Sequence, residues 1–344
     1  MDNILVLSSD GKEIIGVKDR SVTDIGIPDS VTTIGDKAFY NCESLQSVVI
    51  PESVTTIGYQ AFAGCISLHT IDIPDSVNRI LEEAFLRCES LTEVRLPYNL
   101  KTIERSVFEK CTSLKNIIIP SSLTHIEGWA FYKCKSLERI VLPNSMVKIA
   151  GYAFSHCSSL SDINIPQNLN RIGNWSFERC ALRSANITIA GKVIGEGAFA
   201  GCKFLENVKI SYGITKIREG AFYGCTSLKT VQLPDSIKTV ERGAFSGCTL
   251  LTEITLENKE DASESDKNIS KMICNSLNKK LTNLNNCELE ELSPFVAGMS
   301  KFKKDNKYGL VDSDGNILKD AVYNDLYSEG DYIYFEDRNG KKVL

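Results

Sequence analysis

The stretch IPESVTTIGYQAFAGCISLHTID, residues 50–72, leads directly into the next Ile-Pro pair, where the same pattern begins again. Ten such cycles of about 23 residues run from residue 27 to residue 256 of the 344-residue chain. A fixed period of this length is typical of repeat architectures, in which each unit packs only against its neighbours. The pattern therefore excludes most enzyme folds that are built around a single core.

Each unit contains one short strand pattern. Leu68, Ile71 and Ile73 alternate with polar residues, which indicates a half-buried strand. One unit cannot bury its apolar side chains alone, whereas stacked units cover one another and leave a continuous core. Parallel strands lie about 4.8 Å apart, so ten coils predict a rod or arc about 50 Å long.

An Ala-Phe pair recurs on the far side of the unit, and we predict that its Phe fills the core there. Phe is kept even where the Ala is replaced by Val107 or Ser176. Burial of a large apolar side chain stabilises the fold by roughly 1.5–3 kcal/mol. A Ser also precedes the apolar residue in the Val slot of most units, which is typical of a turn hydrogen bond and not of a nucleophile.

Ten of the twelve cysteines share one slot of the repeat: Cys42, Cys65, Cys88, Cys111, Cys134, Cys157, Cys180, Cys202, Cys225 and Cys248. Successive thiols occupy equivalent places in parallel coils, so their Cβ vectors point the same way, which does not suit a disulfide. No C-x-x-C pair occurs, and the three histidines fall in three different slots, so we expect no zinc site. We predict a column of small buried hydrophobic residues.

The unit I-P-x-S-V-T-x-I-G-x-x-A-F-x-x-C-x-S-L-x-x-I, best seen in residues 27–48 and 50–71, resembles the BspA-like, or Treponema-type, leucine-rich repeat. The resemblance covers about residues 22–256. It implies a right-handed leucine-rich-repeat solenoid with a parallel β-sheet on the concave face. Short strands, turns and irregular or 3-10 segments are then expected on the convex side. The resemblance also implies binding of other proteins, often host or matrix proteins at a bacterial surface.

The period does not reach either end of the chain. Residues 1–26 are predicted to form an N-terminal β-hairpin cap on the solenoid of residues 27–256, because a terminal apolar face needs a cover. Residues 257–300 are interpreted as a charged linker and an amphipathic helix, since apolar residues recur there every three or four positions: Ile269, Met272, Ile273, Leu277, Leu281 and Leu284. That helix either closes the solenoid or presents its apolar stripe to a partner.

Residues 301–344 are predicted to form a small antiparallel β module. The run Lys307-Tyr308-Gly309-Leu310-Val311-Asp312 is similar to the WG-repeat family, with Tyr308 in the place of the family's Trp. Short strands joined by Gly-containing turns equally fit a β-meander of another kind. The resemblance implies another interaction element and no known chemistry.

One position breaks the period. Ala181-Leu182 follows Cys180 where the unit has C-x-S-L, so this step is 22 residues long. Downstream, Ala185 takes the slot of the strand Ile and Gly191 the slot of the Val. We expect a small cavity, a bend or a softer seam at this place.

The composition and the motifs disfavour several classes of protein. A net charge of −5 disfavours electrostatic binding of nucleic acid, and no apolar run reaches the roughly 20 residues of a membrane-spanning helix. No phosphate-binding loop, nucleophile elbow or zinc-protease motif occurs. We therefore predict a protein that is not an enzyme, with no cofactor, no metal site, no nucleic-acid partner and no membrane insertion.

Because the framework of the repeat is fixed, we expect binding in the slots that vary. Beside the central apolar residue of each strand, the variable residues mix both charges with apolar side chains, which suits a protein partner better than a polyanion. The candidates on this sheet face are Asp72, Glu93, Arg95, Asn116, Arg139, Asp162, Asn164 and Lys209. Ordinary solvated sheet residues without a partner are the alternative.

The slot before the Ala-Phe pair is a second candidate. Three consecutive units carry Trp129, Tyr152 and Trp175 there, and Tyr132 lies close by in sequence. The coil spacing predicts three rings in a row about 5 Å apart, within stacking distance. Trp and Tyr are enriched in binding hot spots. The alternative is a self-packing patch that stiffens the middle of the rod.

The sequence thus predicts a non-catalytic scaffold that binds a protein partner, adhesin-like as the family resemblance implies. The alternative is an intracellular structural or regulatory adaptor whose C-terminal module recruits a second partner. The resemblance implies the cell surface or secretion, while residues 1–7 lack the pattern of a signal peptide and leave a cytoplasmic location open. The repeats do not identify the partner, and a monomer is compatible with them.

Overall fold

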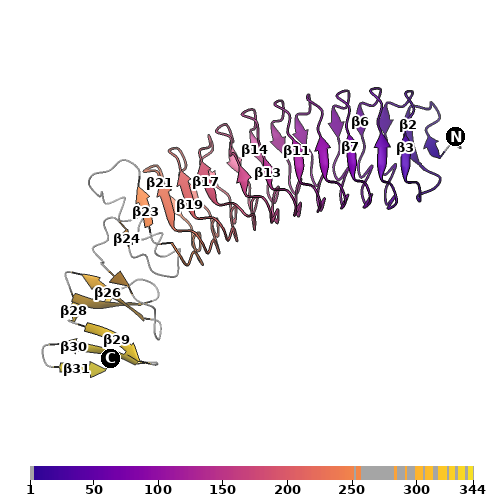
Figure 1. Ribbon diagram of the computed structural model, residues 1–344. Coiled ribbons are helices and arrows are strands. Elements are labelled where there is room, and N and C mark those ends of the chain that lie inside the picture. The colour runs from indigo at the N-terminus through magenta and orange to yellow at the C-terminus, as the bar shows by residue number, and fades with distance from the viewer. Residues whose placement is uncertain are drawn as a thin grey trace.

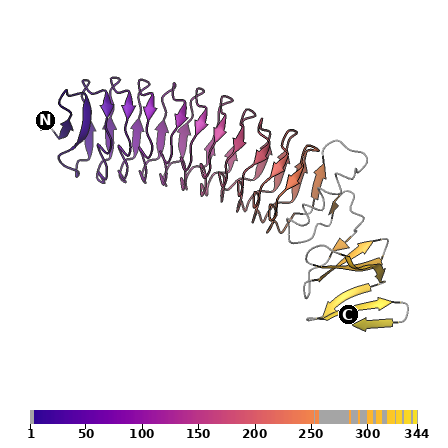
Figure 2. The ribbon, with the colours of Figure 1, turned by 180° about the vertical axis from the view of Figure 1, so that it is seen from behind.

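The computed structural model describes residues 4–251 and 253–256 and, beyond them, short strands between residues 283 and 343. The repeats form coils that stack side by side into an elongated, gently curved rod (Figures 1 and 2). Each coil contributes one strand to each of two parallel ladders. The expected solenoid is confirmed, with a second ladder of very short strands opposite the first and with hydrogen-bonded turns, not 3-10 helices, between the strands of the described coils.

The first ladder is formed by the predicted L-x-x-I-x-L strands. Where neighbouring strands pair, each lies in register with its copy in the next coil, as Glu93 with Asn116 shows, and the ladder is divided into four sheets. Its strands are β3 (Asp24–Gly26), β5 (Ser47–Val49), β7 (Thr70–Asp72), β9 (Glu93–Arg95), β11 (Asn116–Ile118), β13 (Arg139–Ile140), β15 (Asp162–Ile163), β17 (Ser184–Ile187), β19 (Asn207–Ile210), β21 (Thr230–Leu233) and β23 (Glu253–Leu256).

The second ladder uses the V-T-x-I part of the unit, where one buried Ile or Val per coil points into the core. Its strands are β4 (Thr33–Ile34), β6 (Thr56–Ile57), β8 (Arg79–Ile80), β10 (Thr102–Ile103), β12 (His125–Ile126), β14 (Lys148–Ile149), β16 (Arg171–Ile172), β18 (Val193–Ile194), β20 (Lys216–Ile217) and β22 (Thr239–Val240). At the N-terminal end, β1 (Leu5–Leu7) and β2 (Glu13–Val17) form an antiparallel hairpin, and β2 pairs in parallel with β4.

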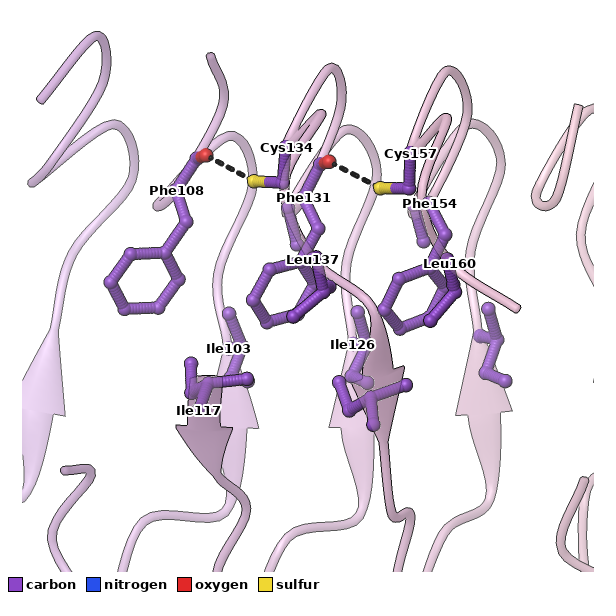
Figure 3. Packing of buried hydrophobic residues seen from close by; sticks show 14 of the residues in the cluster. Ile103, Phe108, Ile117, Ile126, Phe131, Cys134, Leu137, Phe154, Cys157 and Leu160 are labelled. Carbon is purple, nitrogen blue, oxygen red and sulfur yellow. Dashed lines mark hydrogen bonds between the residues drawn. The ribbon is translucent and has the colours of Figure 1, made fainter. Parts of the chain in front are cut away.

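The core consists of columns of identical residues. The ten repeat Phe side chains are fully buried and stack coil on coil, with ring centroids 5.0 Å apart at Phe39–Phe62 and 5.6 Å apart at Phe85–Phe108. The predicted core role of Phe is thereby confirmed. Figure 3 shows three of these rings above the Ile side chains of the two ladders.

The ten repeat cysteines are buried free thiols, as predicted. The structure adds a hydrogen bond that the sequence does not reveal. From Cys65 onward, each repeat thiol donates to the backbone carbonyl of the Phe in the preceding coil, as Cys134 Sγ does to Phe108 O at 3.1 Å (Figure 3). The same carbonyl accepts the N–H of the Cys in its own coil, here Cys111. The thiol column therefore links coil to coil.

The recurring Ser side chains do make hydrogen bonds, and these bonds also join successive coils. Ser53 Oγ donates to the carbonyl oxygen of Val31 at 2.7 Å, and Ser76 repeats this contact with Val54 at 2.8 Å.

Ser176 lies in another slot of the repeat, the one in which eight coils have Ala. Its hydroxyl is fully buried and has no hydrogen-bond partner. The structure gives no reason for this Ser.

The shortened coil after Cys180 changes the ladders but leaves the columns intact. Second-ladder strands β16 and β18 share one residue pair, Ile172 with Ile194. The first ladder is interrupted between β15 and β17, as it also is between β5 and β7 and between β11 and β13. There is no cavity at Gly191, because a Cβ there would lie 1.8 Å from the carbonyl oxygen of Asn170, so the backbones are in close contact. The expected bend or softer seam stays a prediction.

Beyond the coils, β24 (Asn283–Leu284) pairs in parallel with β23. The amphipathic helix expected from Ile269 lies outside the described residues, except that Leu284 is in a strand and not in a helix. The remaining strands form two antiparallel sheets: β25 (Glu291–Leu292), β26 (Met299–Lys304), β27 (Lys307–Asp312) and β28 (Ile317–Tyr323) in one, and β29 (Asp325–Glu329), β30 (Tyr332–Asp337) and β31 (Gly340–Val343) in the other. The likeness to the WG repeat stays a prediction.

The thiol column predicts a loss of stability at alkaline pH. Burial raises the pKa of eight repeat thiols above the usual value of 9.0, to about 12 for Cys202. Unfolded thiols ionise near the usual value, so the stabilisation is complete below about pH 8 and declines as the pH rises through 9 and above. Each thiol contributes about 1.4 kcal/mol per pH unit in that window.

The urea midpoint of unfolding, measured from about pH 8 to about pH 10.5, should therefore fall steeply. The Cys134→Ala variant serves as the control, because it removes one buried thiol and should show a shallower fall. A midpoint that stays constant over this range, or fast reaction of the ten repeat thiols of the native protein with a thiol reagent, would contradict a buried column.

Candidate partner-binding surface

The slot before the Ala-Phe pair has a left-handed backbone. In this slot, Trp129, Tyr152 and Trp175 have φ values of 58°, 60° and 57°. Their backbone N–H groups donate to carbonyl oxygens of the next coil, and that of Trp175 reaches Glu196 O at 2.7 Å. This ladder of turn hydrogen bonds fixes where each Cβ points, so equivalent side chains in successive coils lie above one another.

The three aromatic rings form a continuous stack, as the spacing predicted. The ring centroids of Trp129 and Tyr152 lie 5.2 Å apart with an interplanar angle of 4°, and those of Tyr152 and Trp175 lie 6.4 Å apart at 12°. All three residues are half-buried. We call Trp129, Tyr152 and Trp175 the aromatic row.

The two ends of the aromatic row differ. At one end, the guanidinium carbon of Arg105 lies 4.9 Å from the centroid of the Trp129 ring, which is a cation–π distance. At the other end, the ring of Trp175 lies against Gly197, where a Cβ would come within 2.3 Å of the indole carbon Cε3. Gly197 is therefore required for the Trp175 ring to lie flat on the next coil.

A pocket of about 370 Å³ lies beyond Trp175. It exists because the turn slot is Gly in each of the last three coils, at Gly197, Gly220 and Gly243. Its lining consists of Trp175, Glu196, Glu219, Gly220, Tyr223, Arg242, Gly243 and Ser246. This pocket was not expected from the sequence, although the change from aromatic residues to Gly in one slot was the signal for it.

Tyr132 lies in the same group of turns but outside the aromatic row. Its ring makes an edge contact with His156 at 5.5 Å between centroids, and Lys133 Nζ lies 4.9 Å from the ring centroid. Burial lowers the pKa of His156, so its imidazole is neutral at pH 7. Glu178 accepts a hydrogen bond from Ser155 at 2.9 Å beside it. Tyr132 is thus held in a polar cluster beside the aromatic row.

On the sheet face, four of the predicted charged residues are paired with one another or with a neighbouring turn. Arg95 donates two hydrogen bonds to Asp75, at 2.9 and 3.0 Å, and its Nε lies 3.6 Å from Asp72. Arg139 and Asp162 form an ion pair at 3.0 Å. These exposed pairs contribute roughly 0–1 kcal/mol each and leave fewer unpaired charges for a partner than the sequence suggested.

The other predicted sheet residues divide into two groups. The side chain of Asn164 bonds both backbone groups of Leu142 at 2.7 Å, so its amide supports the framework. Glu93, Asn116 and Lys209 are exposed on their strands. The structure brings the eight sheet candidates onto one face of the first ladder but does not gather them into a cluster.

Three exposed apolar side chains on the sheet face were not among the candidate residues. Val49, Ile118 and Val141 are 69%, 63% and 57% exposed in the same slot of the repeat. Ile118 and Val141 belong to adjacent coils, so the two side chains are neighbours on the surface. Isolated exposed apolar residues are ordinary, whereas adjacent ones begin to form a patch.

The described residues contain no group of three or more His, Cys, Asp or Glu side chains that could hold a metal ion. In that part of the chain, no helix has the length and apolar character needed to cross a membrane. The arrangement offers surfaces for contact with a partner.

The coils are similar to known repeat proteins. The family model described as BspA type leucine rich repeat region matches residues 17–137, 83–206 and 192–293, with 6 copies. A leucine-rich repeat protein from Bacteroides ovatus is 31% identical with a TM-score of 0.63, over 74% of this chain and 67% of that chain. A leucine-rich repeat protein from Treponema pallidum is 30% identical with a TM-score of 0.49, over 52% of this chain and 88% of that chain. No curated protein matches the chain.

Gly197 and Gly220 provide a matched test of the aromatic row. Both have a positive φ, so Gly→Ala carries the same backbone cost, about 1 kcal/mol, at each site. A Cβ at Gly197 collides with the Trp175 ring, whereas at Gly220 the nearest atom is Tyr223 Cβ at 3.7 Å. Gly197→Ala should lose about 1–3 kcal/mol more than Gly220→Ala, the usual cost of overpacking.

The measurement is urea unfolding of both variants, together with tryptophan fluorescence of the native proteins. The emission spectrum should change in Gly197→Ala and stay constant in Gly220→Ala. Equal losses of stability with identical spectra would show that Trp175 does not lie on Gly197.

Proposed function

Because this chain belongs to the BspA type leucine rich repeat family, we propose that it is a non-catalytic scaffold that binds a protein partner through the turns bearing the aromatic row. The family and its solved members support a protein-interaction scaffold. The adhesin-like role and the identity of the partner belong to the proposal. The observation that carries it is the stack of Trp129, Tyr152 and Trp175 on three consecutive coils.

The energetics of the turn slot support a binding role. A side chain in a left-handed backbone position costs about 1–2 kcal/mol, which Gly avoids, as it does in the last three coils. Stacking of an aromatic pair contributes about 0.5–1.5 kcal/mol beyond its burial. Strain therefore offsets much of the stacking, and each ring keeps part of its surface in solvent. A partner that covers these rings would gain the contact area typical of a hot spot.

The surroundings of the aromatic row also resemble an interface. Cationic side chains lie over aromatic rings at two places beside the row: Arg105 over Trp129, and Lys133 over Tyr132. Interfaces are enriched in aromatic residues and Arg relative to the rest of a protein surface. The sheet face, with Ile118 and Val141 exposed, supports a second contact for a partner that wraps around the rod.

The double variant Trp129→Ala, Trp175→Ala of the full chain tests the proposal. We expect it to bind the partner at least about 30-fold more weakly, the effect of losing about 2 kcal/mol at a hot spot. Its urea midpoint should fall only modestly, because the stacking contacts are lost while the Cβ of Ala keeps the cost of the left-handed backbone. The matched control is Gln60→Ala, Glu83→Ala, which alters the same left-handed slot in other coils.

The partner is first captured with the intact chain and identified by mass spectrometry, and its affinity for each variant is then measured. Unchanged affinity together with a large loss of stability would favour the self-packing alternative. A partner that is lost only when the chain ends at residue 256, with the coils shown to be folded by circular dichroism, would favour the adaptor alternative.

A further inference from the structure

We infer that the pocket beyond Trp175 is a recognition site for an arginine side chain of the protein partner. The inference rests on the proposed function, since it identifies which group of the partner the aromatic row receives. Three observations carry it: the face of Trp175 that no side chain covers, the Gly slots that hollow out the next coils, and two carboxylates at the rim.

The chain itself shows how the aromatic row ends. Trp129 stacks on Tyr152 of the following coil, and Arg105 of the preceding coil covers its other face at 4.9 Å. One terminal ring is thus capped by a guanidinium from within the chain. At the opposite terminus the Gly197 backbone lies against Cδ2, Cε3 and Cζ3 of Trp175, and no side chain from that slot covers the rest of the ring. A guanidinium from another molecule would complete the row in the same way.

The volume beyond Trp175 fits such an insertion. Gly220 and Gly243 lack the side chains that fill this slot in the first seven coils, and the pocket of about 370 Å³ that they leave is lined by Trp175 and Tyr223. Ligand pockets in proteins begin at about 300 Å³. Tyr223 is 57% exposed, so its ring is available as a second apolar wall for the methylene stem of an Arg.

The charge of the rim selects a cation. Glu196 and Glu219 occupy the same repeat position in adjacent coils, directly before Gly197 and Gly220, and both line the pocket. No ion pair joins either carboxylate to another residue in the described part of the chain. Glu241, one coil further, differs in this respect, because Lys216 and Arg218 neutralise it. A planar guanidinium can stack on the indole and donate to carboxylates at once, which favours Arg over Lys.

Arg242 also lines the pocket, in the same repeat position as Glu196 and Glu219 and one coil beyond Glu219. Its coil lies three steps from that of Trp175, about 14 Å along the rod. It therefore bounds the site on the side away from the indole and would exclude a second cation there. An acidic peptide held by Arg242 is the outcome that opposes our proposal.

The test uses the full ¹⁵N-labelled chain and blocked tripeptides of the form acetyl-Gly-Xaa-Gly-amide, with Arg, citrulline, Tyr or Glu as Xaa. The chain has two tryptophans, so two indole N–H signals are observed, and Trp129→Phe assigns them. The Arg peptide should shift the Trp175 signal in a saturable manner and leave that of Trp129 in place. Citrulline, which has the same shape without the charge, should bind at least about fivefold more weakly, as expected when a cation–π contact and an ion pair are lost.

Two sets of variants, each with its own control, locate the site. Glu196→Gln and Glu219→Gln should each weaken binding of the Arg peptide about two- to fivefold, the effect of one exposed ion pair. Glu82→Gln is their control, because Glu82 has the same repeat position in a distant coil. Gly220→Trp fills the pocket and should abolish the shift, whereas Glu83→Trp, in the same left-handed slot elsewhere, should not.

The proposal is overturned if no saturable shift occurs, if citrulline binds as well as Arg, or if the Tyr peptide binds more tightly. It is also overturned if the Glu peptide binds and Arg242→Gln removes that binding. Failure of the proposed function gives a different result: the Arg peptide binds at Trp175, but no protein partner depends on the aromatic row. If binding of the partner depends on the aromatic row and is unchanged by Gly220→Trp, the pocket proposal is overturned and the proposed function still stands.

Discussion

Each coil of this protein is covered only by the next coil, so every slot of the repeat must stack on its own copy. The buried Phe rings show the constraint most plainly, with centroids 5.0–5.6 Å apart along the whole rod. A residue type that packs well on itself at this spacing can occupy a slot in all coils. The core is therefore a set of columns, and its order follows from one repeated contact.

Much of this core could be predicted from the sequence, because the period shows which residues share a column. Phe62 and Cys65 were expected to be buried, and both are fully buried. The bond from Cys65 Sγ to Phe39 O could not be predicted, since it joins residues that lie 26 positions apart. A repeat identifies columns but does not tell which backbone group of the preceding coil faces a given side chain.

The candidate surface, too, was predictable only in part. The aromatic row was predictable, because three aromatic residues in one slot have no other arrangement when the coils are in register. The left-handed backbone of that slot was hidden by Lys37, Gln60 and Glu83, although its Gly residues in the last coils were a signal. The pairing of Arg95 with Asp75 was also missed, since Asp75 lies in a turn outside the strand pattern. At the seam, Gly191 permits close contact of two backbones, where residue size alone suggested a void.

The central claim is that each slot interacts with its copy in the adjacent coil and with no coil further away. Double-mutant cycles on the aromatic row test it directly, with Ala at each position and unfolding by urea as the readout. The account predicts a coupling of about 0.5–1.5 kcal/mol between Trp129 and Tyr152, which stack. Trp129 and Trp175, which are separated by one coil, should be additive within about 0.5 kcal/mol. Additivity of the stacked pair, or equal coupling of the separated pair, would contradict the account.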